Sequence, residues 1–178
     1  IPLLQKYGEV DLLISGTQVD VNLAQAIKYR FHGFSFVFGK KGGVDHYKTW
    51  KSMNLFQFRK DLNMLPLKNY NLILNDFEPI SAWACKFQGV ESVSLSHQAS
   101  FRSEKVPRPK TIDWGKLILN RYAPTTHHVG FHFDKYDDFI YTPVIRSEIR
   151  AHTPTNLGHY TVYLPAIDDK DLVPLLKQ

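Results

Sequence analysis

The sequence contains a single cysteine, Cys85, and no long apolar run. One cysteine cannot form an internal disulfide, which is typical of proteins from a reducing compartment. No apolar segment approaches the roughly 20 residues that a membrane-spanning helix needs. No signal peptide, internal repeat or low-complexity segment is visible, and because the chain opens without methionine we expect its natural start to lie upstream of Ile1. A disulfide-rich scaffold and a repeat array are thereby excluded.

The composition is that of an ordinary globular protein. Of the 178 residues, 43% are hydrophobic, 22% are charged and 13% are aromatic. These values exclude disorder, collagen and coiled coil as descriptions of the whole chain. The length suits one domain, or one domain with a fragment of a second.

Positive charge is concentrated in one segment. The chain has 22 Lys and Arg residues against 17 Asp and Glu, a formal net charge of +5. Residues 102–121 hold six basic and two acidic residues. The basic ones are Arg102, Lys105, Arg108, Lys110, Lys116 and Arg121. This segment fits either a solvated surface loop or a patch for an anionic partner, namely a phosphate, an acidic lipid surface or nucleic acid.

Strand and helix patterns alternate along the chain. The expected strands are residues 10–14, 29–38, 72–74, 90–95, 128–133 and 139–142, and the expected helices are residues 49–65, 80–87 and 114–122. Alternation of this kind predicts an α/β fold, a Rossmann-like and mostly parallel open sheet with helices on both faces.

The first residues have the pattern of a helix end, with Gly8 as its C-cap. Residues 10–14 (VDLLI) then form an apolar run that suits a strand buried on both faces. A helix that leads into a parallel strand normally follows an earlier strand of the same sheet. We therefore expect the chain to begin inside a βα unit, with residues 10–14 near the middle of the sheet and an unfilled strand position.

The last residues predict the start of a second domain. Residues 151–159 are polar, contain proline and have the pattern of a linker. Residues 160–164 (YTVYL) are expected to form a strand, and Asp168 or Asp169 to cap the helix that follows. Because one βα unit cannot bury its own apolar face, we expect a domain at residues 1–150, a linker, and a truncated domain at residues 160–178.

Polar residues follow two of the expected strands. Asp76 and Glu78 come after residues 72–74, and His97 and Gln98 come after residues 90–95. In open parallel sheets ligands bind beyond the carboxyl ends of the strands, so these four residues predict one site. In an extended segment the two carboxylates point the same way, and one could orient a histidine that takes a proton from a hydroxyl. Two alternatives remain: Asp76 or Glu78 caps the helix begun by Pro79, and His97 packs against Phe101.

A glycine- and lysine-containing segment and a group of histidines are weaker indications of a binding site. Residues 39–43, with Lys40 and Lys41, match neither the P-loop nor the dinucleotide fingerprint, and they fit an anion cradle or a surface loop. His127, His128 and His132 invite a metal hypothesis, but no cysteine supports them and strand histidines with surface tips are commoner. We expect no metal.

Several short motifs resemble a known family. They are LILNDFEP at residues 72–79, SHQ at residues 96–98, YTPVIR at residues 141–146 and the strand that begins at Tyr160. In this order they resemble the N-terminal domain of GT-B glycosyltransferases of the family 28-like group, which includes the peptidoglycan N-acetylglucosaminyltransferase. Two features of that group have no counterpart here. Its glycine-rich loop with a histidine would lie before Ile1, and PAID at residues 165–168 replaces its glycine-serine loop.

The resemblance implies transfer of a sugar from a nucleotide-sugar donor to an acceptor hydroxyl on a lipid or glycan. The donor is a co-substrate held mainly by a C-terminal domain, no cofactor is expected, and this chain alone is expected to be inactive. It also implies a cytoplasmic location with peripheral contact to the inner face of the membrane. Within this hypothesis the catalytic residues are His97, Asp76 and Glu78, and the residues that bind the acceptor are Gln98, Ser96 and Arg102. The residues expected to face an anion or a membrane are Lys40, Lys41, Lys105, Arg108 and Lys110. Arg146 is expected to lie between the two domains.

Two functions other than sugar transfer also fit parts of the sequence. A module that binds nucleic acid or another polyanion would use the same basic segment. Single-strand binders, however, place aromatic residues among the basic ones, and residues 102–121 hold only one, Trp114, inside an expected helix. Nucleic acid is therefore not an expected partner. A GT-B sugar-nucleotide epimerase shares the fold, and the sequence does not separate it from a transferase.

Overall fold

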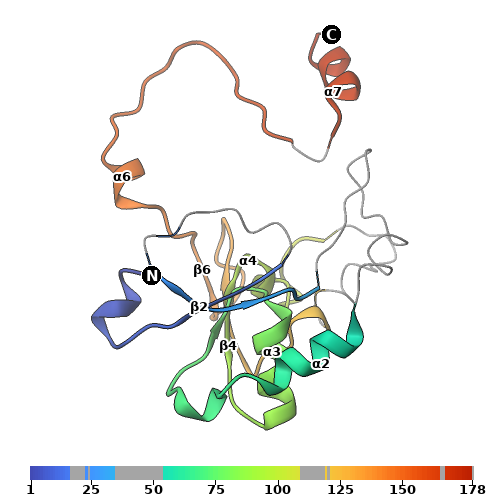
Figure 1. Cartoon of the computed structure of the whole chain (residues 1–178). Helices are drawn as coiled ribbons and strands as arrows, with labels where there is room; N and C mark the ends of the chain where they lie inside the picture. The colour runs from blue at the N-terminus through green and yellow to red at the C-terminus, as the bar shows by residue number, and fades with distance from the viewer. Residues whose placement is uncertain are drawn as a thin grey trace. The chain divides into compact units, whose positions relative to one another are not determined.

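The structure is a computed structural model. It describes residues 1–16, 23, 25–34, 54–108, 119, 121–164 and 167–177. Contacts divide the chain into two units, which are described separately (Figure 1). The first unit holds the described residues up to Phe34 together with Asn54–Val144, and the second holds those from Ile145 onward.

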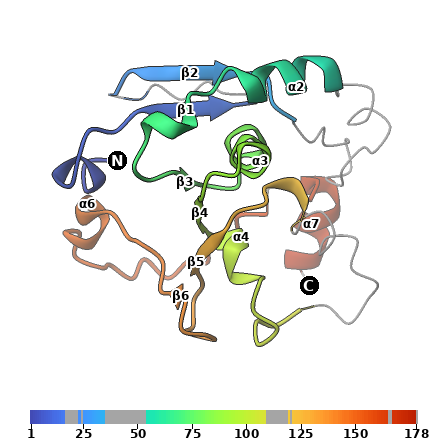
Figure 2. The same cartoon turned by 90° about the horizontal axis from the view of Figure 1, so that it is seen from below.

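The first unit contains two sheets in which every strand pair is parallel. The first sheet is β1 (Leu12–Ser15) with β2 (Ile27–Phe31), and the second has the order β3 (Leu74–Asn75), β4 (Val93–Ser96), β5 (His127–Phe131) and β6 (Ile140–Tyr141). Figure 2 shows the four strands of the second sheet following one another in this order. The predicted α/β class with a parallel, Rossmann-like sheet flanked by helices is confirmed.

The predicted position of the first strand is wrong. We expected residues 10–14 to be buried on both faces near the middle of one sheet. In the structure β1 begins at Leu12, pairs only with β2 within the described residues, and is half-buried along its whole length. An edge strand has only one ladder to protect it, so its apolar side chains keep part of their surface in contact with water.

Side chains connect the two sheets at both ends of β1. The Tyr70 hydroxyl donates to Asp11 Oδ2 at 2.6 Å just before the strand. At the other end the Ser15 hydroxyl donates to Glu78 Oε1 at 2.5 Å. Because Tyr70 precedes β3 and Glu78 follows it, β1 and β3 run in the same direction.

Helix ends in the first unit follow capping rules. In α2 (Leu55–Asn63) the Asn54 side chain accepts from the Gln57 amide at 2.9 Å. Helix α3 (Pro79–Gln88) has proline in its first turn and ends at Gly89, whose φ of 65° is left-handed. The short helices are α4 (His97–Ser100), η1 (Leu4–Lys6) and η2 (Leu67–Asn69). Among the described helices, none combines the length and apolarity that crossing a membrane requires.

The main core lies between these helices and the strands. Its fully buried members are Leu62, Leu65, Leu67, Ile80, Ala84 and Cys85. Half-buried Leu13 and Tyr29 from the first sheet and Ile73, directly before β3, pack against the same cluster. Apolar burial of this kind is the main stabilising term for the unit, and it positions α3 against both sheets.

The second unit has no buried residue among those described. Its helices are α6 (Ser147–Arg150) and α7 (Asp169–Leu176), and Asp168 caps α7 as predicted by accepting from the Lys170 amide at 3.0 Å. The strand predicted at residues 160–164 is wrong, since this segment has no regular structure and Tyr160 is 99% exposed. A strand needs a partner for its backbone groups, and the described residues offer it none.

Gly130 in β5 is required for the close approach of α4. A Cβ at this position would lie 2.8 Å from the backbone of Ser100. We predict that Gly130→Ala destabilises the fold by about 1 to 3 kcal/mol, because α4 must move away from the sheet. Urea unfolding followed by circular dichroism measures the change. Gly8→Ala is the control, since its Cβ meets nothing within 4 Å, and equal stability of the two variants would contradict the prediction.

Candidate active site

The carboxyl ends of β3 and β4 bring two predicted site segments to the same sheet edge. The two strands pair in parallel, with Asn75 opposite Ser94. Asp76 directly follows β3, and His97 directly follows β4 as the first residue of α4. The sequence prediction that these strands are neighbours is confirmed, and this edge is where ligands bind in open parallel sheets.

The geometry between Asp76 and Glu78 differs from the extended segment that we predicted. Phe77 between them has a φ of 53°, in the left-handed region that bulky residues seldom adopt. Its ring packs on Tyr122 with centroids 4.8 Å apart. This turn directs Glu78 back to α3 and leaves Asp76 exposed. Backbone strain of this kind is concentrated at functional sites, where the surrounding structure holds it in place.

Glu78 is the N-cap of α3. Its Oε1 accepts from the Ile80 amide at 2.6 Å, and its Oε2 accepts from the Ser81 amide and hydroxyl, both at 2.7 Å. Together with the bond from Ser15, four donors occupy this carboxylate. The capping alternative therefore describes Glu78, and the catalytic role predicted for it is replaced by a structural one, because its oxygens are already used.

Asn75 supports the same turn and was missed by the sequence analysis. It is 1% exposed and its side chain makes three hydrogen bonds. Nδ2 donates to the Glu78 carbonyl at 2.7 Å and to the Ser81 hydroxyl at 2.8 Å, and Oδ1 accepts from the Glu78 amide at 3.0 Å. A polar residue at the end of the apolar run LIL was the available signal.

The carboxyl of Asp76 is partly desolvated. Loss of solvation raises the pKa of its carboxyl above the ordinary value. The charged form is therefore disfavoured in the folded state, and ionisation of Asp76 opposes folding as the pH rises through its folded pKa.

His97 is held by the main chain. Its Nδ1 lies 2.7 Å from the carbonyl oxygen of Phe131, at the end of β5. We predicted that a carboxylate would orient this ring, and that prediction is wrong: a carbonyl does so, because α4 crosses the end of β5 at this point. A carbonyl oxygen only accepts, so Nδ1 carries the proton and the neutral ring has its lone pair on Nε2.

Aromatic rings surround His97 on the same edge. Its ring centroid lies 5.3 Å from that of Phe101, edge to face, as the structural alternative predicted. It also lies 5.4 Å from the ring of His132, which in turn contacts Tyr136 at 4.9 Å. The sequence analysis considered His132 only as a metal ligand, and its proximity to His97 depends on a pairing of β4 with β5 that spacing along the chain does not reveal.

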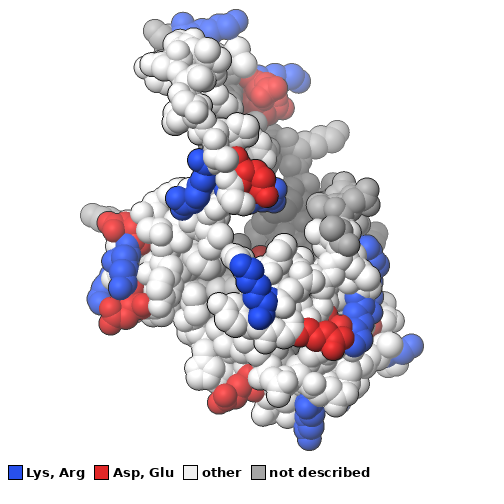
Figure 3. Space-filling view, turned by 90° about the vertical axis from the view of Figure 1, so that its left-hand side faces the viewer, with Lys and Arg blue, Asp and Glu red and all other residues white. Residues whose placement is uncertain are grey.

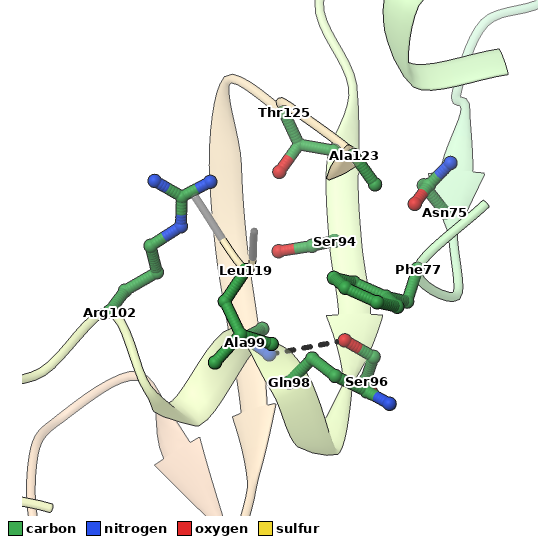
Figure 4. A pocket seen from close by; sticks show the side chains of 10 residues that line it. All are labelled: Asn75, Phe77, Ser94, Ser96, Gln98, Ala99, Arg102, Leu119, Ala123 and Thr125. Atoms are coloured by element: carbon green, nitrogen blue, oxygen red, sulfur yellow. Dashed lines mark hydrogen bonds between the residues drawn. The ribbon is translucent and has the colours of Figure 1, made fainter. Parts of the chain in front are cut away.

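The three residues predicted to bind an acceptor line one pocket. Ser96, Gln98 and Arg102 lie around it together with Ser94 and Phe77 (Figure 4). The Ser96 hydroxyl is used to cap α4, where it accepts from the Ala99 amide at 3.1 Å. Desolvation lowers the pKa of the Arg102 guanidinium. The other polar side chains that line the pocket are Asn75, Ser94 and Thr125, so its lining combines residues within β3 and β4 with residues outside the strands.

The basic residues predicted to face an anion are engaged within the protein where the structure describes them. Lys105 Nζ lies 3.3 Å from Asp137 Oδ1. The Arg108 guanidinium donates to the carbonyl oxygens of Phe101 and Ser103, the latter at 2.7 Å. Lys40, Lys41 and Lys110 lie outside the described residues, and Arg146 is exposed at the start of α6. On the face shown in Figure 3, basic and acidic side chains are interspersed.

The other histidines of β5 have separate partners. His127 Nε2 lies 3.7 Å from Glu91, at the amino end of the strand. His128 Nδ1 lies 3.0 Å from the Ser94 hydroxyl, and burial lowers the pKa of its ring. Within the part of the chain that the structure describes, no three His, Cys, Asp or Glu side chains are grouped in a way that could hold a metal ion.

Comparisons with known proteins found no match to this chain among protein-family models, curated proteins or solved structures. The site is therefore interpreted from its own residues.

The two carboxylates of this edge are predicted to differ in their effect on stability. Glu78→Ala should lower the free energy of unfolding by about 1 to 2 kcal/mol, because it removes the cap of α3. Asp76→Ala is the matched control and should change it by less than about 0.5 kcal/mol. Urea titrations at neutral pH measure both, and a larger loss in Asp76→Ala than in Glu78→Ala would contradict the assignment.

The pH dependence of Asp76 has a predicted sign. Since its folded pKa is raised, protonation stabilises the folded state, and this contribution is lost as the pH rises from the ordinary aspartate value through the folded pKa. Asp76→Asn should therefore be at least as stable as the wild type at neutral pH, and its advantage should disappear in acid. Thermal unfolding at a series of pH values provides the measurement, and a wild type that gains stability over Asp76→Asn with rising pH would refute the sign.

Proposed function

We propose that this chain forms the acceptor-side part of a glycosyltransferase that moves a sugar from a nucleotide-sugar donor to an acceptor hydroxyl. The observation that carries the proposal is His97, an exposed imidazole at the carboxyl edge of a parallel sheet whose Nδ1 is bound to a main-chain carbonyl. A ring held in this way presents the lone pair of Nε2, which is what a general base needs.

In the proposed reaction His97 Nε2 takes the proton of the acceptor hydroxyl as the oxygen attacks the anomeric carbon of the donor. The carbonyl of Phe131 keeps the ring in one orientation and continues to accept from Nδ1 after protonation. No electron pair or proton is left unassigned: the hydroxyl oxygen forms the new bond to carbon, the bond to the nucleotide phosphate breaks, and His97 retains the proton.

Asp76 is the second residue proposed for this step, because it directly follows β3, the strand that pairs with β4. Ser96, Gln98 and Arg102, which line one small pocket, are the residues proposed to contact the acceptor.

The acceptor is proposed to be a lipid or a glycan, and the donor a nucleotide sugar whose phosphates are stabilised by backbone amides and helix dipoles. The rival polyanion-binding function is less well supported by the described residues. Lys105 pairs with Asp137, and Arg108 donates to two carbonyl oxygens, so these two cations stabilise the loop after α4 rather than an exposed basic patch.

The experiment is a turnover assay on the protein expressed from its complete reading frame. A panel of UDP- and GDP-sugars is incubated with lipid and glycan acceptors, and release of the nucleotide is followed. His97→Gln should lower turnover by at least about a hundredfold, because a positioned base contributes that much. His127→Gln, at the opposite end of β5, is the control. Equal turnover in wild type and His97→Gln, or no release from any donor, would reject the proposal.

A further inference from the structure

Two histidines lie side by side at the carboxyl edge of the sheet. His97 begins α4 and His132 directly follows β5, and Figure 2 shows this helix beside this strand. Their ring centroids are 5.4 Å apart and the planes are inclined by 33°. The two imidazole rings are thus close enough for one small molecule to contact both.

Main-chain bonds give the two rings opposite tautomers. His97 donates from Nδ1 to the Phe131 carbonyl at 2.7 Å, so its neutral ring has a lone pair on Nε2. His132 does the reverse, since its Nδ1 accepts from the Phe133 amide at 2.9 Å and the proton of its neutral ring is on Nε2. One ring thus offers a hydrogen-bond acceptor and the other a donor.

We propose that His97 and His132 together bind adjacent hydroxyl groups of a saccharide ring. One hydroxyl donates to Nε2 of His97 and the oxygen of its neighbour accepts from Nε2–H of His132. This inference rests on the proposed function and deepens it, because it identifies the acceptor as a polyhydroxylated ring and adds His132 as a binding residue. A single alcohol would satisfy only one of the two imidazoles.

Aromatic side chains complete a site for such a ring. Phe101, Phe133 and Tyr136 all meet the His132 ring nearly edge to face, at centroid distances of 6.4, 6.0 and 4.9 Å. Phe133 is 88% exposed. The apolar C–H face of a saccharide can cover such a surface while its hydroxyls face the histidines, and burial of apolar area supplies part of the affinity.

Two of the charged groups near the pair are bound to one another, and a third binds a backbone amide. Those on the elements packed against the two rings are Arg102, Glu104, Lys105, His128, Asp134, Lys135, Asp137 and Asp138. Lys105 pairs with Asp137, and Asp134 accepts from the Lys135 amide at 2.8 Å. The polar atoms that the ring cluster itself supplies are the histidine nitrogens and the hydroxyl of Tyr136.

The first test reads the tautomers directly. Nitrogen-15 spectra of the wild-type chain at mildly alkaline pH, where an ordinary imidazole is neutral, should show Nδ1–H for His97 and Nε2–H for His132. Two rings with the same tautomer would overturn the proposal. This measurement needs no variant and so does not depend on any substitution folding correctly.

The second test measures binding by chemical-shift titration with methyl glycosides of glucose, galactose, mannose and N-acetylglucosamine. At least one should bind, while tetrahydropyran-2-methanol, which has the ring without adjacent hydroxyls, should bind at least about threefold more weakly. His97→Phe and His132→Phe keep a ring in the cluster and should each weaken binding about three- to tenfold, the loss of one hydrogen bond. His127→Phe is the matched control and should bind as the wild type does.

Failure of this inference is distinguishable from failure of the proposed transfer. Binding of no glycoside, or equal binding by the two histidine variants and His127→Phe, would overturn the paired site. If a glycoside binds as described but the complete protein releases no nucleotide from any donor, the paired site stands and the transferase proposal fails.

Discussion

The carboxylate of Glu78 is the interaction on which the arrangement of the sheet edge depends. It caps α3 through the amides of Ile80 and Ser81 and accepts from Ser15 at the end of β1. One side chain thus sets the start of the helix that fills the core and connects the first sheet to the turn after β3. Because a half-buried cap with several donors is costly to replace, the turn that carries Asp76 after β3 has little freedom.

At this sheet edge, residues of the same type have different roles: some stabilise the fold and others are available for chemistry. Glu78 and Asp76 are two positions apart, yet the left-handed Phe77 sends one into the helix cap and leaves the other exposed. The histidines of β5 divide in the same way. His128 is enclosed beside Ser94, whereas His132 lies past the strand end among aromatic rings. Local backbone geometry, rather than residue type, decides which of these groups can reach a ligand.

Sequence reasoning found the class of fold and much of the edge, and its errors have specific causes. Alternation predicted the parallel sheet, and the helix expected at residues 80–87 is α3. Sequence reasoning wrongly predicted a strand at residues 160–164, because strand formation depends on a pairing partner as well as on propensity. It assigned Glu78 to chemistry because two carboxylates at spacing two look alike until the φ of Phe77 is known. The contact between His97 and His132 joins segments that only the strand order brings together.

An imidazole anchored by a main-chain carbonyl differs in one respect from one anchored by a carboxylate. A carboxylate both orients the ring and favours its positive charge, whereas the carbonyl of Phe131 orients His97 with a weaker electrostatic effect. The position of this carbonyl is fixed by the pairing of β5 with β6 and by the contact of Gly130 with α4. The orientation of the proposed base is therefore a property of the sheet itself.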